Sequence, residues 1–229
     1  MAAPPAARFT PTQRTRGRRV PDRLRYDREF VYEILDEALI CHMGFVDERG
    51  QPFVIPTLCA RVDDEIYLHG SAASRALRAM TAGVRVCVTA TIVDGIILAR
   101  SAFFHSINYR SAVVFGTATA ITDPDEKLAA LRRFTDTLVA PGRFDAVRSP
   151  SRQEFKATMI ARMPIEEASA KTRSGPPADL EEDLDREVWA GVIPIELRAG
   201  RGVPAPDLRA GVSMPRYASR YSRKRSARA

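Results

Sequence analysis

Residues 67–75 read YLHGSAASR, and this stretch marks the point where a strand ends and a helix begins. The apolar strand ends at His69 and Gly70, and small residues with a helical pattern follow. Hydroxyl groups and free backbone N–H groups at a helix start point at an anion, and the helix dipole favours negative charge there. The alternative is that Ser71 and Ser74 only cap the helix.

Two pairs of serine and arginine extend this anion-binding pattern. Arg75 follows Ser74 directly, and its guanidinium offers a planar set of donors that matches a phosphate. Residues 105–111 read HSINYRS, which predicts a loop of varied polar groups between two apolar strands. In this loop Arg110 and Ser111 repeat the same chemistry. The two pairs can together clamp one phosphate, from one subunit or from two.

The net charge of +7 is concentrated at the two ends of the 229-residue chain. Residues 1–20 carry five arginines and residues 216–229 carry six basic residues, with no acidic residue in either segment. Removing these eleven charges leaves residues 21–215 at −4. We therefore expect basic, mobile tails. Arginine and tyrosine in the C-terminal tail allow nucleic-acid binding, but the acidic body does not favour it.

The cysteine pattern and the hydropathy favour a cytoplasmic protein. Cys41, Cys59 and Cys87 lie in apolar strand-like runs, which is typical of buried thiols in a reducing compartment. Cysteine and histidine spacings show no metal site. No uncharged apolar run approaches the roughly 20 residues of a membrane span, and the N-terminus lacks the apolar region of a secretory signal. Composition leaves an organellar transit peptide open.

The hydrophobic pattern predicts short strands joined by tight turns, with a few helices. Strands are predicted over residues 39–46, 52–62, 65–70, 84–93, 95–104, 111–122 and 188–197, with a passage from helix to strand over 155–164. Helices are predicted after the N-caps Asp27 and Asp123 and over residues 74–81. Asp94-Gly95 predicts a hairpin turn.

This order of elements predicts a mainly β protein with flanking helices (α+β), built as a closed or nearly closed antiparallel barrel. We expect one domain over residues 21–200, between a basic disordered tail at 1–20 and a Pro/Arg-rich disordered tail at 201–229. Neither a GxGxxG nor a P-loop motif is present, so the usual dinucleotide and nucleotide sites are not encoded.

Pro56 lies inside the strand-like stretch FVIPT, residues 53–57. A proline removes one donor from a strand ladder and marks an edge or a bulge. Neighbouring backbone groups can then bond a flat heterocycle. The alternative is an edge-strand proline that discourages aggregation.

These stretches occur in an order that resembles the flavin-binding split barrel of the pyridoxamine 5'-phosphate oxidase superfamily. The resemblance is carried by FVIPT (53–57), YLHGSAASR (67–75), VCVTATIVDG (86–95) and NYRSAVVFG (108–116). SAFFHSINYRS (101–111), SAKTR (169–173) and VWAGVIP (188–194) are similar to the nitroimidazole-reductase-related branch. The resemblance implies a six-stranded antiparallel split barrel that forms a homodimer, with FMN at each of two interfacial sites.

The resemblance also implies which residues bind the cofactor. Along the isoalloxazine ring it places Ile55, Pro56 and Thr57. Toward the ribityl chain and phosphate it places His69, Gly70, Ser71, Ser74 and Arg75. It completes the site with Thr89, Asn108, Tyr109, Arg110 and Ser111, the last four from either subunit, and Trp189 caps the ring. Lys171 and Arg173 are a cofactor-rim or interface pair, or solvated charge.

Two departures shape the functional expectation. Ala76 stands where pyridoxamine oxidases carry a lysine, and their C-terminal tryptophan-and-arginine signature is not evident. The resemblance then implies an FMN-dependent oxidoreductase that reduces a small acceptor such as a nitroaromatic by hydride transfer from flavin N5. His69 is the expected catalytic contact to substrate, or else a histidine satisfied by backbone. The alternative is a non-catalytic flavin-, deazaflavin- or haem-binding barrel, for which His105 and His42 would also become candidate ligands.

Overall fold

The computed structural model describes residues 7–222 apart from residues 75–76, 78–79 and 81–82. The strands are β1 (Leu24–Arg25), β2 (Ile40–Val46), β3 (Pro52–Val62), β4 (Glu65–Ser71), β5 (Val84–Leu98), β6 (Ser106–Ala120), β7 (Thr158–Pro164), β8 (Glu167–Arg173) and β9 (Gly191–Pro194). The helices are α1 (Arg28–Glu37), α3 (Pro124–Leu138), α4 (Arg152–Ala157) and α5 (Arg216–Ser219). Short 3₁₀ segments are η1 (Pro21–Arg23), η2 (Ala102–Phe104) and η3 (Glu181–Asp183).

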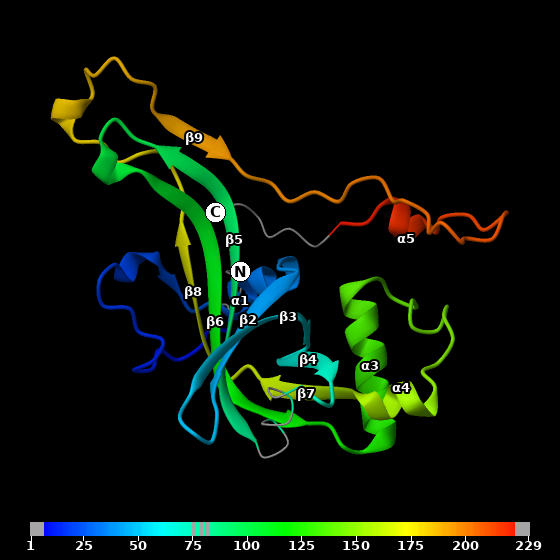
Figure 1. The fold of residues 1–229 in the computed structure, drawn as a ribbon. Coiled ribbons are helices and arrows are strands. Elements are labelled where there is room, and N and C mark those ends of the chain that lie inside the picture. Colours follow the sequence, from blue (N-terminus) through cyan, green and yellow to red (C-terminus); the bar gives the residue numbers. More distant parts are fainter. Residues whose placement is uncertain (1–6, 75–76, 78–79, 81–82, 223–229) are drawn as a thin grey trace, which may run out of the picture.

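Six strands close a ring in which every pairing is antiparallel. Around the ring, β2 pairs with β3, β3 with β4, β4 with β7, β7 with β6, β6 with β5, and β5 with β2. β6 meets β7 only at Thr119 and Ala120, because its first half pairs with β8 over residues 109–115. β8 and β1 extend the sheet beyond β6, and β9 extends it beyond β5 (Figure 1). The predicted six-stranded split barrel is therefore confirmed.

The helix starts follow the capping signals in the sequence. Asp123 accepts a hydrogen bond at 2.8 Å from the backbone N–H of Glu126, and Pro124 occupies the first turn of α3. Ser151 and Glu154 form a capping box at the start of α4. Asp27 precedes α1 as predicted, but its carboxylate pairs with arginine side chains rather than capping the helix.

Alternating strand residues divide the core into two parts. The main cluster fills the barrel and the space under α1, whose Val31 and Ile34 are fully buried. The second cluster lies under α3 and includes Tyr67 of β4 and Phe134 of α3. Successive side chains of a strand point to opposite faces, so β4 sends Ile66 and Leu68 into the first cluster and Tyr67 toward the second.

The predicted hairpin turn at Asp94-Gly95 is wrong. β5 continues through this point with a bulge, and the chain turns back later, through residues 99–105. The Asp94 carboxylate binds Arg110 of β6, and a Cβ at Gly95 would lie 2.8 Å from Val192 of β9. Glycine is therefore needed for close strand approach rather than for a turn.

The polar stretch 105–111 is not the predicted loop, because residues from Ser106 onward belong to β6. The predicted strand over 188–197 is shorter and covers only β9. β8 was not predicted, since its sequence EASAKTR is rich in small and charged residues. Those alanines face the core, where Ala168 and Ala170 are buried.

Residues 7–20 pack against the domain and are not the predicted disordered tail. Phe9 is 2% exposed, joins the main core, and donates its backbone N–H to the Tyr26 carbonyl at 2.8 Å. Thr15 is also buried. The five arginines of residues 1–20 led to the prediction of disorder, and the composition gave no sign that Phe9 would be buried.

The C-terminal segment leaves β9 and reaches α3 (Figure 1). The Tyr217 hydroxyl accepts a hydrogen bond from Arg143, and the Tyr221 hydroxyl donates to the Leu138 carbonyl at 3.1 Å. Two tyrosines thus fix the end of a segment whose side chains are mostly exposed. Among the described helices, none combines the length and apolar character needed to span a membrane.

Candidate functional site

Two of the predicted cofactor-binding segments, residues 55–57 and 69–71, lie on the adjacent strands β3 and β4, just beyond the point where the pairing of these strands ends. β3 and β4 pair from Val62 and Glu65 to Cys59 and Leu68, and the pairing does not continue beyond them. Residues 55–57 therefore lie beyond the last pair on β3, and residues 69–71 lie beyond it on β4. β3 remains paired with β2 along this stretch, so one side of residues 55–57 is open to a ligand. Their cofactor role stays a prediction.

His69 points toward α3 rather than into the barrel. Its ring centroid lies 5.1 Å from that of Phe134. Burial lowers the pKa of His69 below its ordinary value of 6.5, so the imidazole is neutral at neutral pH. A neutral imidazole can donate one hydrogen bond to a substrate oxygen and accept one, but it supplies no positive charge.

The Ser71 hydroxyl is used inside the turn after β4, and residues 75–76, at the start of the helix predicted over 74–81, lie outside the described residues. This hydroxyl accepts the backbone N–H of Ala73 at 3.2 Å, and the Ser71 carbonyl accepts the N–H of Ser74 at 2.9 Å. A Cβ at Gly70 would approach Leu77 to 3.0 Å, so the chain is closely packed at this turn. The predicted phosphate ligand Arg75 lies outside the described residues.

Arg110 is held inside the protein by two carboxylates, so we do not retain it as a phosphate ligand. Its guanidinium makes paired hydrogen bonds of 2.7 and 3.0 Å to Glu37 and of 2.9 and 2.8 Å to Asp94. The Arg110 side chain is only 5% exposed. The hydrogen bond with Asp94 is the main cause that raises the pKa of Arg110. Sequence reasoning missed both acids, because Asp94 was expected in a turn and Glu37 lies on α1, 73 residues from Arg110 in the sequence.

The remaining predicted residues of β5 and β6 lie on two faces of the sheet. Thr89 donates to the carbonyl of Ala112 at 3.1 Å, and Ser111 donates to the carbonyl of Lys171 at 3.3 Å. Tyr109 is the register partner of Arg173.

Asn108 is buried and connects two segments. Its amide donates to the Gly175 carbonyl at 3.1 Å, and its Oδ1 accepts from Arg173 at 2.8 Å. It therefore ties β6 to the end of β8 and to the chain that follows β8.

Trp189 is 64% exposed and lies just before β9. Gly191, the first residue of β9, pairs with Leu98 near the end of β5, whereas Thr89 lies nearer the start of that strand. The structure thus separates Trp189 along β5 from Thr89, and its proposed contact with a cofactor ring stays a prediction.

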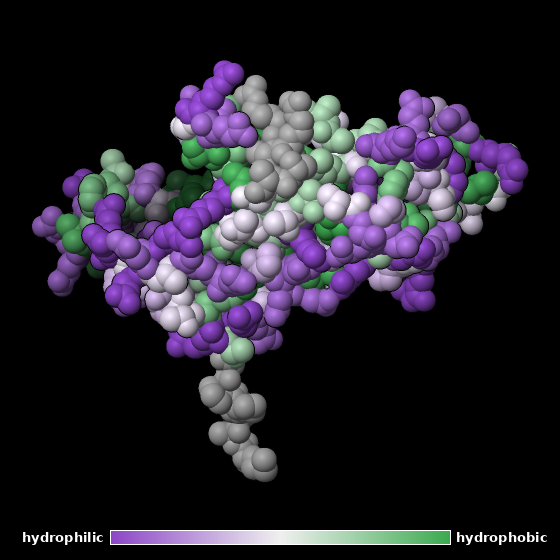
Figure 2. Space-filling model, turned by 90° about the horizontal axis from the view of Figure 1, so that it is seen from below, coloured by the Kyte–Doolittle hydropathy of each residue, from purple (hydrophilic) through white to green (hydrophobic). Residues whose placement is uncertain are grey.

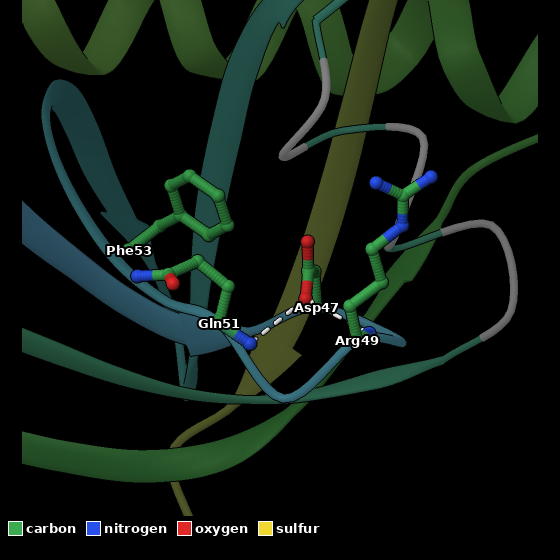
Figure 3. A pocket seen from close by; sticks show the side chains of 4 residues that line it. All are labelled: Asp47, Arg49, Gln51 and Phe53. Carbon is green, nitrogen blue, oxygen red and sulfur yellow. Dashed lines mark hydrogen bonds between the residues drawn. The ribbon is translucent and has the colours of Figure 1, made fainter.

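Two surface pockets lie away from the predicted residues. One, of about 500 Å³, is lined by Asp47, Arg49, Gln51 and Phe53 at the β2–β3 turn (Figure 3). There the Asp47 carboxylate accepts backbone N–H groups of Arg49 and Gln51 at 2.9 Å, which stabilises the turn. The other is lined by residues 152, 153, 156 and 157 of α4.

The surface hydropathy and the positions of possible metal ligands were compared with the predicted site. From below, hydrophilic residues cover much of the molecule, with hydrophobic residues between them (Figure 2). Within the described part of the chain, no group of three or more His, Cys, Asp or Glu side chains is placed to hold a metal ion.

Comparison with known proteins establishes the family: the chain belongs to the pyridoxamine 5'-phosphate oxidase family, whose model matches residues 27–172. It is similar to the flavocytochrome Anf3 from Azotobacter vinelandii, with 39% identity and a TM-score of 0.85 over 93% of this chain and 98% of that one. It is also similar to an FAD and heme binding protein from Mycobacterium smegmatis, with 34% identity and a TM-score of 0.82 over 88% and 98% of the two chains.

A more distant structure supports the fold alone. It is a candidate 5-nitroimidazole antibiotic resistance protein from Bacteroides thetaiotaomicron, with 21% identity and a TM-score of 0.54 over 65% of this chain and 85% of that one. No curated protein matches the chain.

Proposed function

We propose that this chain is a redox protein that binds a flavin and, in addition, haem. The observation that carries the proposal is the extent of its similarity to the flavocytochrome, 39% identity over 93% of this chain. That similarity extends beyond residues 27–172, so it includes part of the chain outside the region that the family shares. A second relative, at 34% identity, is described as binding FAD and heme.

The residues present fit a flavin at the opening between β3 and β4. A flavin ring has hydrogen-bonding groups along one edge, and strand edges left unpaired beyond Cys59 and Leu68 can meet them. Ile55 is half-buried and supplies an apolar neighbour. When bound, the flavin would supply the electron-transfer chemistry, while the protein binds it, orients it and limits access of water. The description of the Mycobacterium smegmatis relative favours FAD over the FMN expected from the sequence.

We also propose a homodimer that uses the outer face of the barrel. Val46, Val54 and Leu58 on β2 and β3 are 52%, 69% and 46% exposed, which leaves an apolar surface on neighbouring strands. Sedimentation at micromolar concentration should give twice the mass of the chain. A monomer under these conditions would remove this part of the proposal. Reduction of a nitroaromatic acceptor stays a prediction from the sequence.

An absorption spectrum of the purified protein, with released cofactors identified, tests the proposed function. We expect the two bands of oxidised flavin together with an intense Soret band. Flavin bands alone, unchanged after haem is added, would remove haem from the proposal. A protein that binds neither cofactor when both are supplied would contradict the proposed function as a whole.

A further inference from the structure

Three isoleucines form a row across the outer face of the sheet. Ile107 of β6 is the register partner of Ile96 of β5, and Ile96 is also the partner of Ile193 of β9. Their exposed fractions are 43%, 41% and 44%. Side chains of register partners lie on the same face of a sheet, so this isoleucine row is a flat apolar surface that spans three strands.

Trp189 enlarges this apolar surface. Gly191 lies two residues before Ile193 and so faces the same side of β9. A Cβ at Gly191 would lie 2.9 Å from the six-membered ring of Trp189, so the indole covers Gly191 next to the isoleucine row. Most of the indole surface is nevertheless exposed. The absence of a side chain at Gly191 is what lets the indole lie there.

His105 lies at the edge of the isoleucine row, two residues before Ile107 and immediately before β6. It is exposed, and its Nδ1 lies 3.0 Å from the carbonyl oxygen of Ser101. A carbonyl only accepts hydrogen bonds, so Nδ1 carries a proton, and in the neutral imidazole the free lone pair is then on Nε2. This is the arrangement of a metal-binding histidine whose second nitrogen is fixed by a backbone carbonyl.

Two basic side chains lie farther along the same face. Lys171 and Arg173 alternate outward on β8, and Arg173 is the register partner of Tyr109, two residues beyond Ile107. Within the described residues, neither Lys171 nor Arg173 forms a salt bridge. Burial and then the nearby charge of Arg23 lower the pKa of Arg173, whose guanidinium donates to the amide oxygen of Asn108 at 2.8 Å.

We infer that this face, from His105 across the isoleucine row to Arg173, is the haem site, with His105 as an iron ligand and Arg173 binding a propionate. Haem is flat, apolar over most of its area and negatively charged at one edge, and it carries a metal that imidazole ligates. The isoleucine row matches the apolar plane, His105 matches the iron, and Arg173 matches the negatively charged edge. The flavin then belongs to the opening between β3 and β4. This inference rests on the proposed function.

Haem titration of three histidine variants tests the assignment. The chain has three histidines, so His105→Gln is compared with His42→Gln and His69→Gln under identical conditions. We expect His105→Gln alone to lose or shift the Soret band and to bind haem at least tenfold more weakly. In His105→Gly, added imidazole should restore the band. Circular dichroism of each variant checks folding.

The propionate contact is tested with Arg173→Gln and with Arg152→Gln, an exposed arginine on α4, as the matched control. We expect Arg173→Gln to weaken haem binding roughly tenfold, as for a lost charge-assisted hydrogen bond. Haem dimethyl ester, whose propionates are uncharged, should bind to Arg173→Gln as tightly as it binds to the wild type. An equal effect on both ligands would overturn the propionate assignment.

The outcomes separate this inference from the proposed function. If the wild-type chain binds no haem, the proposed function fails and the inference fails with it. If the wild type binds haem and His105→Gln binds it equally well, only the inference fails. Loss of the Soret band in His42→Gln or His69→Gln instead would move the iron ligand to that histidine.

Discussion

Replacing Arg110 with alanine should cost about 3 kcal/mol of folding free energy, near the lower end of the range for breaking a buried ion pair. The substitution leaves Glu37 and Asp94 without the cation that lies 2.7–3.0 Å from their oxygens. Their side chains are 16% and 24% exposed, so water relieves part of the cost. A domain of this size has a stability of about 5–15 kcal/mol, so the loss should be plain in a urea titration.

The assay is equilibrium urea unfolding at pH 7, followed by circular dichroism. Tryptophan fluorescence is a poor probe, because Trp189 is largely exposed in the folded state. Arg148→Ala is the control: Arg148 also makes a two-point contact with Glu154, at 2.7 and 2.6 Å, but on the open surface. Solvent screens that pair, so its loss should leave the urea midpoint close to that of the wild type.

Arg110→Lys separates charge from geometry. A lysine keeps the positive charge but cannot make two paired contacts at once, so its stability should fall between those of the wild type and the alanine variant. If Arg110→Ala unfolds at the same urea concentration as Arg148→Ala, the reasoning that burial makes this pair important is refuted.

Two further predictions concern His69 and the N-terminal segment. Because the pKa of His69 is lowered on folding, the unfolded chain binds more protons below about pH 6.5, and stability falls as the pH decreases through that region. His69→Gln should therefore lose less stability than the wild type between pH 7.5 and 5.5 in urea titrations, and an identical loss would contradict this. Phe9→Ala should cost about 3–5 kcal/mol, since Phe9 is a core residue; a change below about 1 kcal/mol would show that residues 7–20 add little to the fold.

The order of the strands and most of their bounds could be predicted from the sequence. β3 extends over Pro52–Val62 as predicted, because its alternation is clear and turn residues flank it. β8 could not be recognised in this way. Its inward residues are alanines, whose weak hydrophobic signal does not distinguish a strand, and its partners β6 and β1 are distant in sequence.

The candidate site shows why local motifs are an incomplete guide. Arg110-Ser111 and Ser74-Arg75 have similar composition, yet Arg110 is turned inward by Glu37 and Asp94, which come from other elements. Nothing next to Arg110 in the sequence reveals that. Similarly, a glycine in the sequence indicates an interruption of regular structure but not its kind. The contacts of Gly95 with the neighbouring strands show that it forms a bulge rather than a turn.

The long pairing of β5 with β6 has a consequence for the order of folding. These strands are joined by residues 99–105 and pair from Val84–Ala118 to Ile97–Ser106, so the chain closes only a short loop to form its longest ladder. By contrast, Leu24 of β1 must find Lys171 of β8 across most of the domain. We expect the β5–β6 hairpin to form early and β1 to dock late, so substitutions in β1 should mainly speed unfolding rather than slow refolding in stopped-flow measurements. The N-terminal segment would then be the last part of the molecule to fold and the first to unfold.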